Sequence, residues 1–401
     1  MLGPNVFKTS QVIDPIWVRI AVLLTALVAF VHVNIPYRFA LTQIMFDYSQ
    51  GWTRRGLVGT LLHPIIAPTF TLQEAYYVAM AITAFGGIVL WVFMWRRLKN
   101  DLTGVFLMLL FVSSVGFAIH WGAVGYLDSL LLACAVWAIC ALERGKWWGS
   151  FAALALMVLA ISIHENALPY FVPTVCFVAY FCASSLRRGI LNAAVVFVGC
   201  AIFTYVLLTV GQLAPNESEA LVELIRTRAE FEPHNHALAV GGRTVLENFD
   251  HFAFVRSTSP YWTWVVFDGV LLAIATSITI WINLNLARSR PILTKVLMVL
   301  AIIAPWSLNI IAYDIPRFGA ASILCGFMIA AVQISRDRGA IDALRHILTL
   351  PVFLVLLLLN VFSGTQPMNT GKVHIYRLPY AVANHVPLWM AEATQDRQNF
   401  D

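Results

Sequence analysis

Long apolar stretches alternate with short polar connections along nearly the whole chain. About eleven of these stretches have the length of a membrane-spanning helix, roughly 17–25 residues. They lie at about 16–36, 74–95, 103–121, 128–143, 149–164, 168–186, 190–211, 262–285, 293–313, 319–334 and 346–363. The pattern therefore predicts an all-α, polytopic transmembrane bundle.

Three segments outside the apolar stretches are long enough to hold structure of their own. Residues 37–73 are too polar to span a membrane and too apolar for a free loop, so we expect helices that lie in the membrane interface. Residues 212–261 contain a helical pattern from Glu219 to Glu230, with Ser218 as the expected N-cap. The remaining segment, 364–401, follows the last apolar stretch. We expect a single transmembrane domain over 1–363 with a C-terminal tail.

Basic residues fall on alternate connections. The connections around 123–127 and 164–166 contain no Lys or Arg. The other set carries Lys8, Arg19, Arg96, Arg97, Lys99, Arg144, Lys146, Arg187, Arg188, Arg288, Arg290, Lys295, Arg336, Arg338 and Arg345. Because cytoplasmic loops are enriched in Lys and Arg, we expect a cytoplasmic N-terminus and, with an odd number of spans, an extracytoplasmic C-terminus. The compact loops favour a bacterial inner membrane.

Composition supports a membrane protein and excludes two other classes. The chain is 60% hydrophobic and only 12% charged, whereas soluble domains carry about 25% charged residues. The net charge of +5 is dispersed among short groups, unlike the basic face of a nucleic-acid-binding protein. The six cysteines lie in apolar runs without a CxxC spacing, so neither a zinc site nor a disulfide framework is expected.

Mixed acidic, basic and imidazole side chains stand at the external ends of the stretches. Ionisable groups at a membrane edge are costly and usually functional, although a lone Lys or Arg there can be an anchor that reaches the interface. The mixture suits a polar chamber where helices converge. Its candidate members are Asp47, Arg54, Arg55, His120, Asp128, His164, Glu165, Asp314 and Arg317.

The segment from Asp47 to Gly56 has the most informative pattern. Arg54 and Arg55 together can hold a phosphate with paired donors. Asp47 could accept a proton from a hydroxyl group, and the flanking glycines allow close backbone approach. The alternative is a charged anchor in which Asp47 pairs with Arg54 or Arg55.

The other candidates also have structural alternatives. Asp128 could be only the N-cap of its helix. His164 and Glu165 could form a local pair, with Glu165 the stronger functional candidate because adjacent helical residues point about 100° apart. Asp314 and Arg317 could bridge within one turn. His120 is the weakest candidate, because a lone histidine near a helix end is more often structural.

The second long loop offers a weaker set. His234 and His236 could share a metal only in an extended segment, and no spacing fixes a third ligand. Solvated histidines are therefore the expectation. Arg226 and Arg228 are expected on a solvated helix face.

The layout resembles the GT-C superfamily of membrane glycosyltransferases, which use polyprenyl-phosphate sugars. The resemblance places Asp47, in the first external loop, as general base and Asp128 as a second acidic residue. Residues 51–59 are also similar to an arginine-glycine segment of bacterial envelope proteins that carry an HE pair and a D-x-x-R-F-like turn. His164-Glu165 and Asp314 to Phe318 match those features. Because Asp47 stands without a second acidic residue, dependence on Mg²⁺ or Mn²⁺ stays open.

The residue patterns and the resemblance together predict a role for each candidate. Catalytic roles go to Asp47, Asp128 and Glu165, and substrate or phosphate binding to Arg54, Arg55, His120, His164, Asp314 and Arg317. The donor implied is a polyprenyl-phosphate-linked sugar, and the acceptor is a glycan or a lipid-linked molecule. An inverting displacement would need one base and cations that offset the phosphate charge.

Two other functions compete with transfer of a single sugar. A polymerase or ligase of lipid-linked polysaccharide would take a diphosphate-linked oligosaccharide. A transporter would favour inverted repeats and charges near the midplane. The sequence shows no repeat, and Asp268, near the start of its stretch, is the only good example of an acidic residue deeper in a span. An enzyme at the external face is therefore favoured.

Overall fold

The computed structural model describes residues 15–32, 36, 38–66, 68–145, 148–242, 269–310, 312 and 314–363, with single positions between 243 and 268. Within this part of the chain the fold is helical. Its one β pairing there is an isolated bridge between Phe70 and Ala229. The predictions that involve Lys8, Lys146, Asp268 and residues 364–401 lie outside the described residues.

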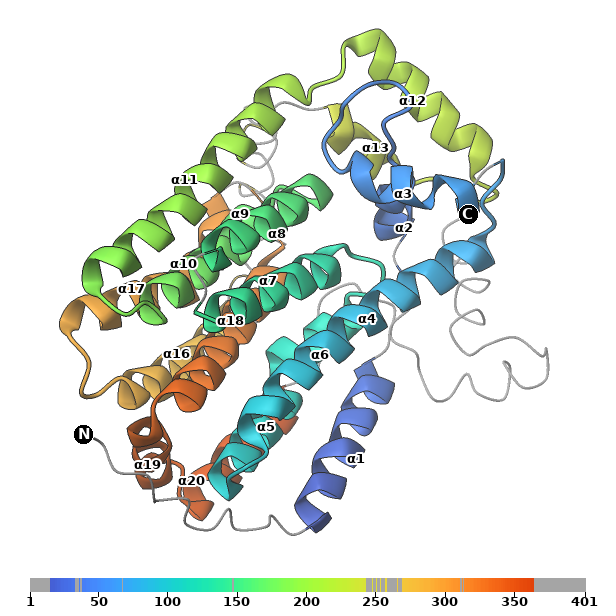
Figure 1. Cartoon of the computed structure of the whole chain (residues 1–401). Coiled ribbons are helices and arrows are strands. Elements are labelled where there is room, and N and C mark those ends of the chain that lie inside the picture. The colour runs from blue at the N-terminus through green and yellow to red at the C-terminus, as the bar shows by residue number, and fades with distance from the viewer. Residues whose placement is uncertain are drawn as a thin grey trace, which may run out of the picture.

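Each of the predicted apolar ranges contains at least one helix. The helices are α1 (Pro15–His32), α4 (Leu72–Leu98), α5 (Leu102–Ser113), α6 (Val115–Gly122), α7 (Asp128–Glu143), α8 (Gly149–Ile163), α9 (Ala167–Tyr170), α10 (Val172–Phe181), α11 (Leu186–Val210), α16 (Val270–Leu286), α17 (Ile292–Ile303), the 3-10 helix η2 (Ala304–Ile310), α18 (Ile315–Arg336), α19 (Arg338–Ile347) and α20 (Leu350–Ser363). Most of them run side by side in one bundle (Figure 1).

Length and apolar composition identify the chain as a membrane protein. Among the described residues, α4, α11, α17 with η2, and α18 are each long and apolar enough to cross a membrane, and two bent pairs raise these four candidates to six. The bent pairs are α5 with α6 and α19 with α20. The other apolar helices, including α8 and α16, are shorter.

The predicted span at 103–121 is broken in the structure. Ser114 has an extended backbone that ends α5, and its hydroxyl then caps α6 by accepting the Phe117 N–H. The two helices therefore meet at 46°. A serine cap is compatible with an apolar pattern on both sides, so hydropathy alone could not reveal this break.

The helix α18 is the centre of the bundle. In its apolar window 94% of the residues are buried, and α4, α6, α10, α16 and α17 pack around it. Its sequence is rich in Gly and Ala, which lets neighbouring backbones approach closely. Because α18 begins at Ile315, Arg317 stands at the N-terminal end of this central helix.

Short helices cover that same end. The first long connection forms α2 (Arg38–Ile44) and α3 (Gly56–Ile66), and the second forms α12 (Pro215–Arg228) and α13 (Asn235–Gly242). Figure 1 shows these four helices gathered at one end of the bundle. The expected N-cap at Ser218 is wrong, because Pro215 starts α12 and the Glu217 carboxylate caps the Ala214 N–H at 2.9 Å.

The second long connection docks onto the first. Phe70 exchanges backbone hydrogen bonds with Arg228 at 2.7 Å and with Glu230 at 3.0 Å. The His234 N–H donates to the Thr42 hydroxyl at 2.9 Å, and its ring packs edge-on against Phe39 on α2. His234 is therefore half-buried, and the expectation of a solvated histidine there is wrong.

Ion pairs connect helices at the other end of the bundle, away from α2, α3, α12 and α13. Arg97 at the end of α4 pairs with Glu143 at the end of α7, and Arg336 at the end of α18 donates to the Glu143 carbonyl. Arg345 on α19 pairs with Asp101. Several of the basic residues that were expected to face the cytoplasm thus lie at the bundle end remote from α2, α3, α12 and α13.

Candidate functional site

The candidate residues converge from four separate parts of the chain. Asp47, Arg54 and Arg55 lie between α2 and α3, and Asp128 is the first residue of α7. His164 and Glu165 lie between α8 and α9, just after α8 ends at Ile163. Asp314 and Arg317 stand at the start of α18. All four parts are at the end of the bundle that α2, α3, α12 and α13 cover.

Arg55 is aimed by an unusual backbone conformation. Among the described residues, Arg55 is the non-glycine residue with a positive φ, 66°. This left-handed conformation costs of order 1–3 kcal/mol, and such residues cluster at functional sites. The guanidinium donates from Nη2 to Glu165 at 2.5 Å and from Nε to both carboxylate oxygens at 3.1 and 3.2 Å. This pairing joins the first connection to the α8–α9 connection.

The neighbouring glycines make this turn possible. A Cβ on Gly59 would lie 2.1 Å from the Phe46 carbonyl oxygen, and one on Gly56 would lie 2.5 Å from the Tyr48 ring. Such distances leave no space for a side chain. The close backbone approach is at Gly59, whereas Gly56 packs against a side chain, and both contacts hold the start of α3 against residues 44–48.

Asp128 and Arg317 form the second pair. The guanidinium contacts both carboxylate oxygens, with Nε to Oδ2 at 2.8 Å and Nη2 to Oδ1 at 2.9 Å. Such bidentate pairing is the strongest arginine geometry. Asp314 accepts from Nη1 at 2.8 Å, and the Tyr126 ring lies 3.9 Å from the guanidinium carbon. Arg317 is thereby held on three sides.

The structure decides two alternatives that the sequence left open: Asp128 as a helix cap, and a self-contained bridge between Asp314 and Arg317. The cap of α7 is Leu127, with no side-chain cap hydrogen bond, so Asp128 is not the N-cap. The bridge between Asp314 and Arg317 exists, but it is not self-contained because Arg317 also binds Asp128 from another helix. Burial raises the pKa of Asp314, while Arg317 opposes the shift.

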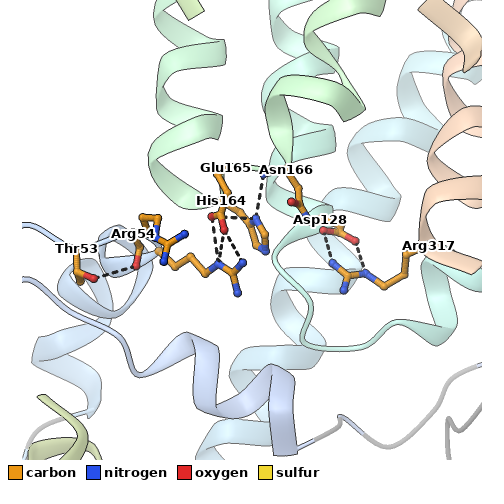
Figure 2. Close-up of polar contacts among 8 residues, drawn as sticks. Thr53, Arg54, Asp128, His164, Glu165, Asn166 and Arg317 are labelled. Atoms are coloured by element: carbon orange, nitrogen blue, oxygen red, sulfur yellow. Dashed lines mark hydrogen bonds and ion pairs between the residues drawn. The ribbon is translucent and has the colours of Figure 1, made fainter. Parts of the chain in front are cut away.

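His164 lies between the two pairs. Figure 2 shows it with Arg54 on one side and with Asp128 and Arg317 on the other. Burial and the charge of Arg55 lower the pKa of His164 to about 3, although Glu165 and Asp128 oppose the shift. The ring is therefore neutral at pH 7. Its Nδ1 accepts the Asn166 N–H at 3.1 Å, so the 3.3 Å approach of Nδ1 to Glu165 is not an ion pair.

The charges of Glu165 and Arg54 also influence each other. Burial disfavours the charged form of Glu165, but the positive charges of Arg55 and Arg54 hold the pKa of this carboxyl well below its usual range. Arg54 is buried, which lowers its pKa, and the charge of Glu165 opposes that shift. Two arginines thus act on one carboxylate.

Asp47 is held outside this group. Its Oδ1 accepts from the Ser49 N–H at 3.0 Å and from the Ser49 hydroxyl at 2.5 Å, and its Oδ2 accepts from Arg228 at 2.6 Å. Burial opposes its ionisation, but these bonds together lower the pKa of Asp47. Arg228 also lies 3.2 Å from His63. The ion pair of Asp47 is therefore with α12, and the alternative of a pair with Arg54 or Arg55 is wrong.

Arg228 is the residue that sequence reasoning missed. It was expected on a solvated face, yet its side chain is only 16% exposed and joins the two long connections. The separation of 181 positions from Asp47 gives no sequence signal. The other missed residue is Tyr170, a buried aromatic in an apolar run.

His120 and a small pocket complete the site. His120 is buried, and its Nε2 lies 3.5 Å from the Ser129 hydroxyl. Both residues line a pocket together with Asp128, Tyr170 and Arg317. His120 therefore belongs to the same end of the bundle as the two ion pairs, although it contacts neither arginine in the described hydrogen bonds.

The described residues do not fit a divalent metal ion. No group of three or more His, Cys, Asp or Glu side chains is arranged as ligands among them. Asp47, Asp128 and Glu165 each face an arginine instead.

Comparison with known proteins adds no assignment, because no protein-family model and no curated protein matches the chain. The geometry itself is informative. Two arginine–carboxylate pairs from four segments meet across a neutral histidine, and a further buried arginine lies beside them. Such a set can bind an anion by exchanging a carboxylate for it, and the released carboxylate can then accept a proton.

Proposed function

We propose that the chain is a membrane glycosyltransferase of the GT-C type. It moves a sugar from a polyprenyl-phosphate donor to a hydroxyl of a glycan or lipid-linked acceptor on the extracytoplasmic face of a bacterial inner membrane. The observation that carries the proposal is the convergence of Arg54, Arg55, Glu165, Asp128 and Arg317 at one end of an apolar bundle.

The proposed topology puts that end outside. About eleven spans with a cytoplasmic N-terminus leave the arginine-rich ends of α4, α18 and α19 in the cytoplasm, as the positive-inside rule requires. A lipid-linked phosphate sits at headgroup depth, where the site end of the bundle would then lie. The short helices α2 and α3 fit the place of interfacial elements in the first external loop.

The phosphate is proposed to bind Arg54 and Arg55. In the structure Arg55 is occupied by Glu165. The phosphate diester of the donor carries one negative charge, as a carboxylate does, and it fits the same guanidinium fork. In the proposal, the donor therefore takes the place of Glu165 on Arg55. Once released from Arg55, the carboxyl loses its largest stabilising charge, and its pKa rises toward its usual range. Binding of the donor thereby produces a base.

The transfer is an inverting displacement. The acceptor hydroxyl attacks the anomeric carbon, the bond from that carbon to the phosphate oxygen breaks, and the electron pair leaves with the phosphate. The arginines stabilise the phosphate released, and a carboxylate takes the hydroxyl proton. The geometry favours Glu165 as this base because it is paired with the phosphate-binding Arg55, whereas the resemblance assigns the role to Asp47.

The test is a transfer assay on the full chain in lipid nanodiscs. Radiolabelled polyprenyl-monophosphate sugars and diphosphate-linked oligosaccharides are supplied in separate reactions with glycan acceptors. We expect transfer from a monophosphate donor. Transfer from the diphosphate donor alone would indicate a polymerase or ligase, and no transfer from either donor would reject the enzyme.

Three variants identify the base. Glu165→Gln should lower kcat at least about 100-fold, the usual contribution of general base catalysis. Asp47→Asn and Arg228→Gln break the same ion pair, so they should have equal effects if Asp47 only joins the two connections. A loss with Asp47→Asn that is much larger than with Arg228→Gln, while Glu165→Gln stays active, would return the base role to Asp47.

A further inference from the structure

A small pocket opens beside the Asp128–Arg317 pair, where α6, α7, α9 and α18 meet. Its polar lining consists of His120, Asp128, Ser129, Tyr170 and Arg317. Phe171 and Ala320 contribute to its apolar wall. The pocket thus shares Asp128 and Arg317 with the candidate site, whereas Arg54 and Arg55 are not part of its lining.

Tyr170 is the unusual member of this lining. Its side chain is among the largest fully buried ones, with 1% exposure. The ring is fixed by edge-on packing against Phe171 at 5.8 Å and against Phe318 at 6.0 Å. Its hydroxyl has no hydrogen-bond partner among the described residues. A buried hydroxyl without a partner destabilises a fold, so a phenylalanine would serve packing better than a tyrosine here.

The charges of the pocket argue against an anionic ligand. Among the lining residues only Arg317 is positively charged, and it already donates hydrogen bonds to the carboxylates of Asp128 and Asp314. No excess positive charge is left there to hold a phosphate. The excess lies instead at Arg54 and Arg55, which share Glu165. The site therefore has a cationic half and a charge-balanced half, with His164 between them (Figure 2).

The remaining groups suit a neutral ligand that carries hydroxyls. The Tyr170 hydroxyl can donate and accept. Ser129 and His120 are 3.5 Å apart, a contact at the outer limit of a hydrogen bond, so each can turn toward a better partner. The space, about 20 Å³, is the size of a water molecule, so it can take one hydroxyl of a ligand held at its mouth.

We infer that this pocket is a saccharide subsite and that Tyr170 is the residue that selects a sugar hydroxyl. Its hydroxyl bonds the ligand, Ser129 and His120 hold a second polar atom, and the phosphate of the same ligand extends past His164 to Arg54 and Arg55. The identity of the saccharide as the donor sugar rests on the proposed function. The binding of hydroxyls in this pocket does not.

The test measures binding of two probes that differ in the group they offer. Hexyl glycosides of glucose, galactose and mannose present a neutral sugar, and hexyl phosphate presents the anion. Each is titrated by calorimetry into the full chain in nanodiscs, with empty nanodiscs to subtract partition into lipid. We expect at least one glycoside to bind, and Tyr170→Phe to weaken it about tenfold, as loss of one hydrogen bond does.

Controls separate recognition from folding. Tyr170→Phe should leave hexyl phosphate binding unchanged and should not lower the melting temperature, because the ring is kept. Tyr180→Phe is the matched variant, since Tyr180 is on α10 and its hydroxyl lies 3.2 Å from Thr294 away from the pocket. It should leave both probes unchanged. Ser129→Ala gives a second, independent reduction in glycoside affinity.

Three results would overturn the subsite: no glycoside bound by the unaltered chain, equal weakening of glycoside and phosphate by Tyr170→Phe, or equal weakening of the glycoside by Tyr180→Phe. The transfer assay separates this outcome from failure of the proposed function. Glycoside binding without transfer rejects the transferase and keeps the subsite. Transfer with a Tyr170→Phe enzyme whose donor KM and glycoside affinity are unchanged keeps the transferase and rejects the subsite.

Discussion

The left-handed backbone of Arg55 shows how a single residue links sequence to site. A non-glycine residue resists this conformation, yet here it directs the guanidinium onto Glu165, 110 positions away. Three hydrogen bonds to one carboxylate offset the backbone strain. Arg54, the adjacent residue, points into the interior and is buried. Two neighbouring arginines therefore have different environments, which no pattern of charges could have distinguished.

His164 makes stability depend on pH. Its folded pKa, about 3, lies below the unfolded value of 6.5, so the unfolded chain binds the proton first. The free energy of unfolding should therefore fall as pH drops from 6.5, by at most about 1.4 kcal/mol per pH unit for one proton. Thermal unfolding of the purified protein between pH 7.5 and 4.5 measures this decline.

The variant that isolates the effect is His164→Asn. An asparagine side chain can keep an acceptor near the Asn166 N–H, which His164 now bonds, and it does not titrate. The decline between pH 6.5 and 4.5 should become shallower in this variant. An identical decline in both proteins would show that other groups cause it. Glu165 and Asp47, whose pKa values are lowered, lose their contribution only at still lower pH.

At the scale of helices, the contact of α4 with α7 positions Asp128. A Cβ on Gly86 in α4 would lie 2.4 Å from the carbonyl oxygen of Ser129 in α7. Backbone cannot move aside as a flexible side chain can, so Gly86→Ala should push the start of α7 away. Overpacking of this kind costs about 1–3 kcal/mol, and it should also reduce transfer because Asp128 moves away from Arg317.

A matched glycine provides the control for that prediction. Gly199 lies inside α11, and its Cβ would meet only the side chain of Leu154, at 2.6 Å. The leucine tip can turn, and alanine has the better helix propensity. Gly199→Ala should therefore keep both the melting temperature and the activity. If Gly86→Ala were as harmless as Gly199→Ala, the start of α7 would not depend on this contact.

At the scale of the whole molecule, the proposed orientation can be measured directly. The helix α11 joins the exposed Arg187 at the basic end to the exposed Glu219 on α12. A membrane-impermeant maleimide should label Glu219→Cys in spheroplasts, and it should label Arg187→Cys only after permeabilisation. The native cysteines lie in helices or at a helix end, half-buried or buried, so the unaltered chain sets the background.

The reverse labelling pattern would place Asp128, Glu165 and Arg317 on the cytoplasmic side. The site would then face the wrong compartment for an extracytoplasmic donor, and the proposed function would fail even if the fold were correct. Labelling at both positions before permeabilisation would mean that α11 does not cross the membrane as one span.

The sequence by itself determined that this is a membrane protein and where its helices lie. Apolar periodicity is local and reflects the bilayer, so each predicted range contains a helix and the polar candidates fall between helices or near helix ends. It also predicted that the candidate ionisable residues share one end of the bundle, because helix direction alternates along the chain. The apolar pattern did not predict the break at Ser114 or the start of α12, because a single cap or proline decides each of them.

Only the tertiary structure decided which charges meet. Arg55 reaches Glu165, Arg317 reaches Asp128, and Arg228 takes Asp47, across separations of 110, 189 and 181 positions. The packing of α18 among its neighbours and the docking of α12 onto the first connection set these pairs, and neither is encoded in a short segment. A charged side chain at a helix end can be recognised from its neighbours in sequence, but its partner is fixed by helix packing, which depends on the shapes of all the helices at once.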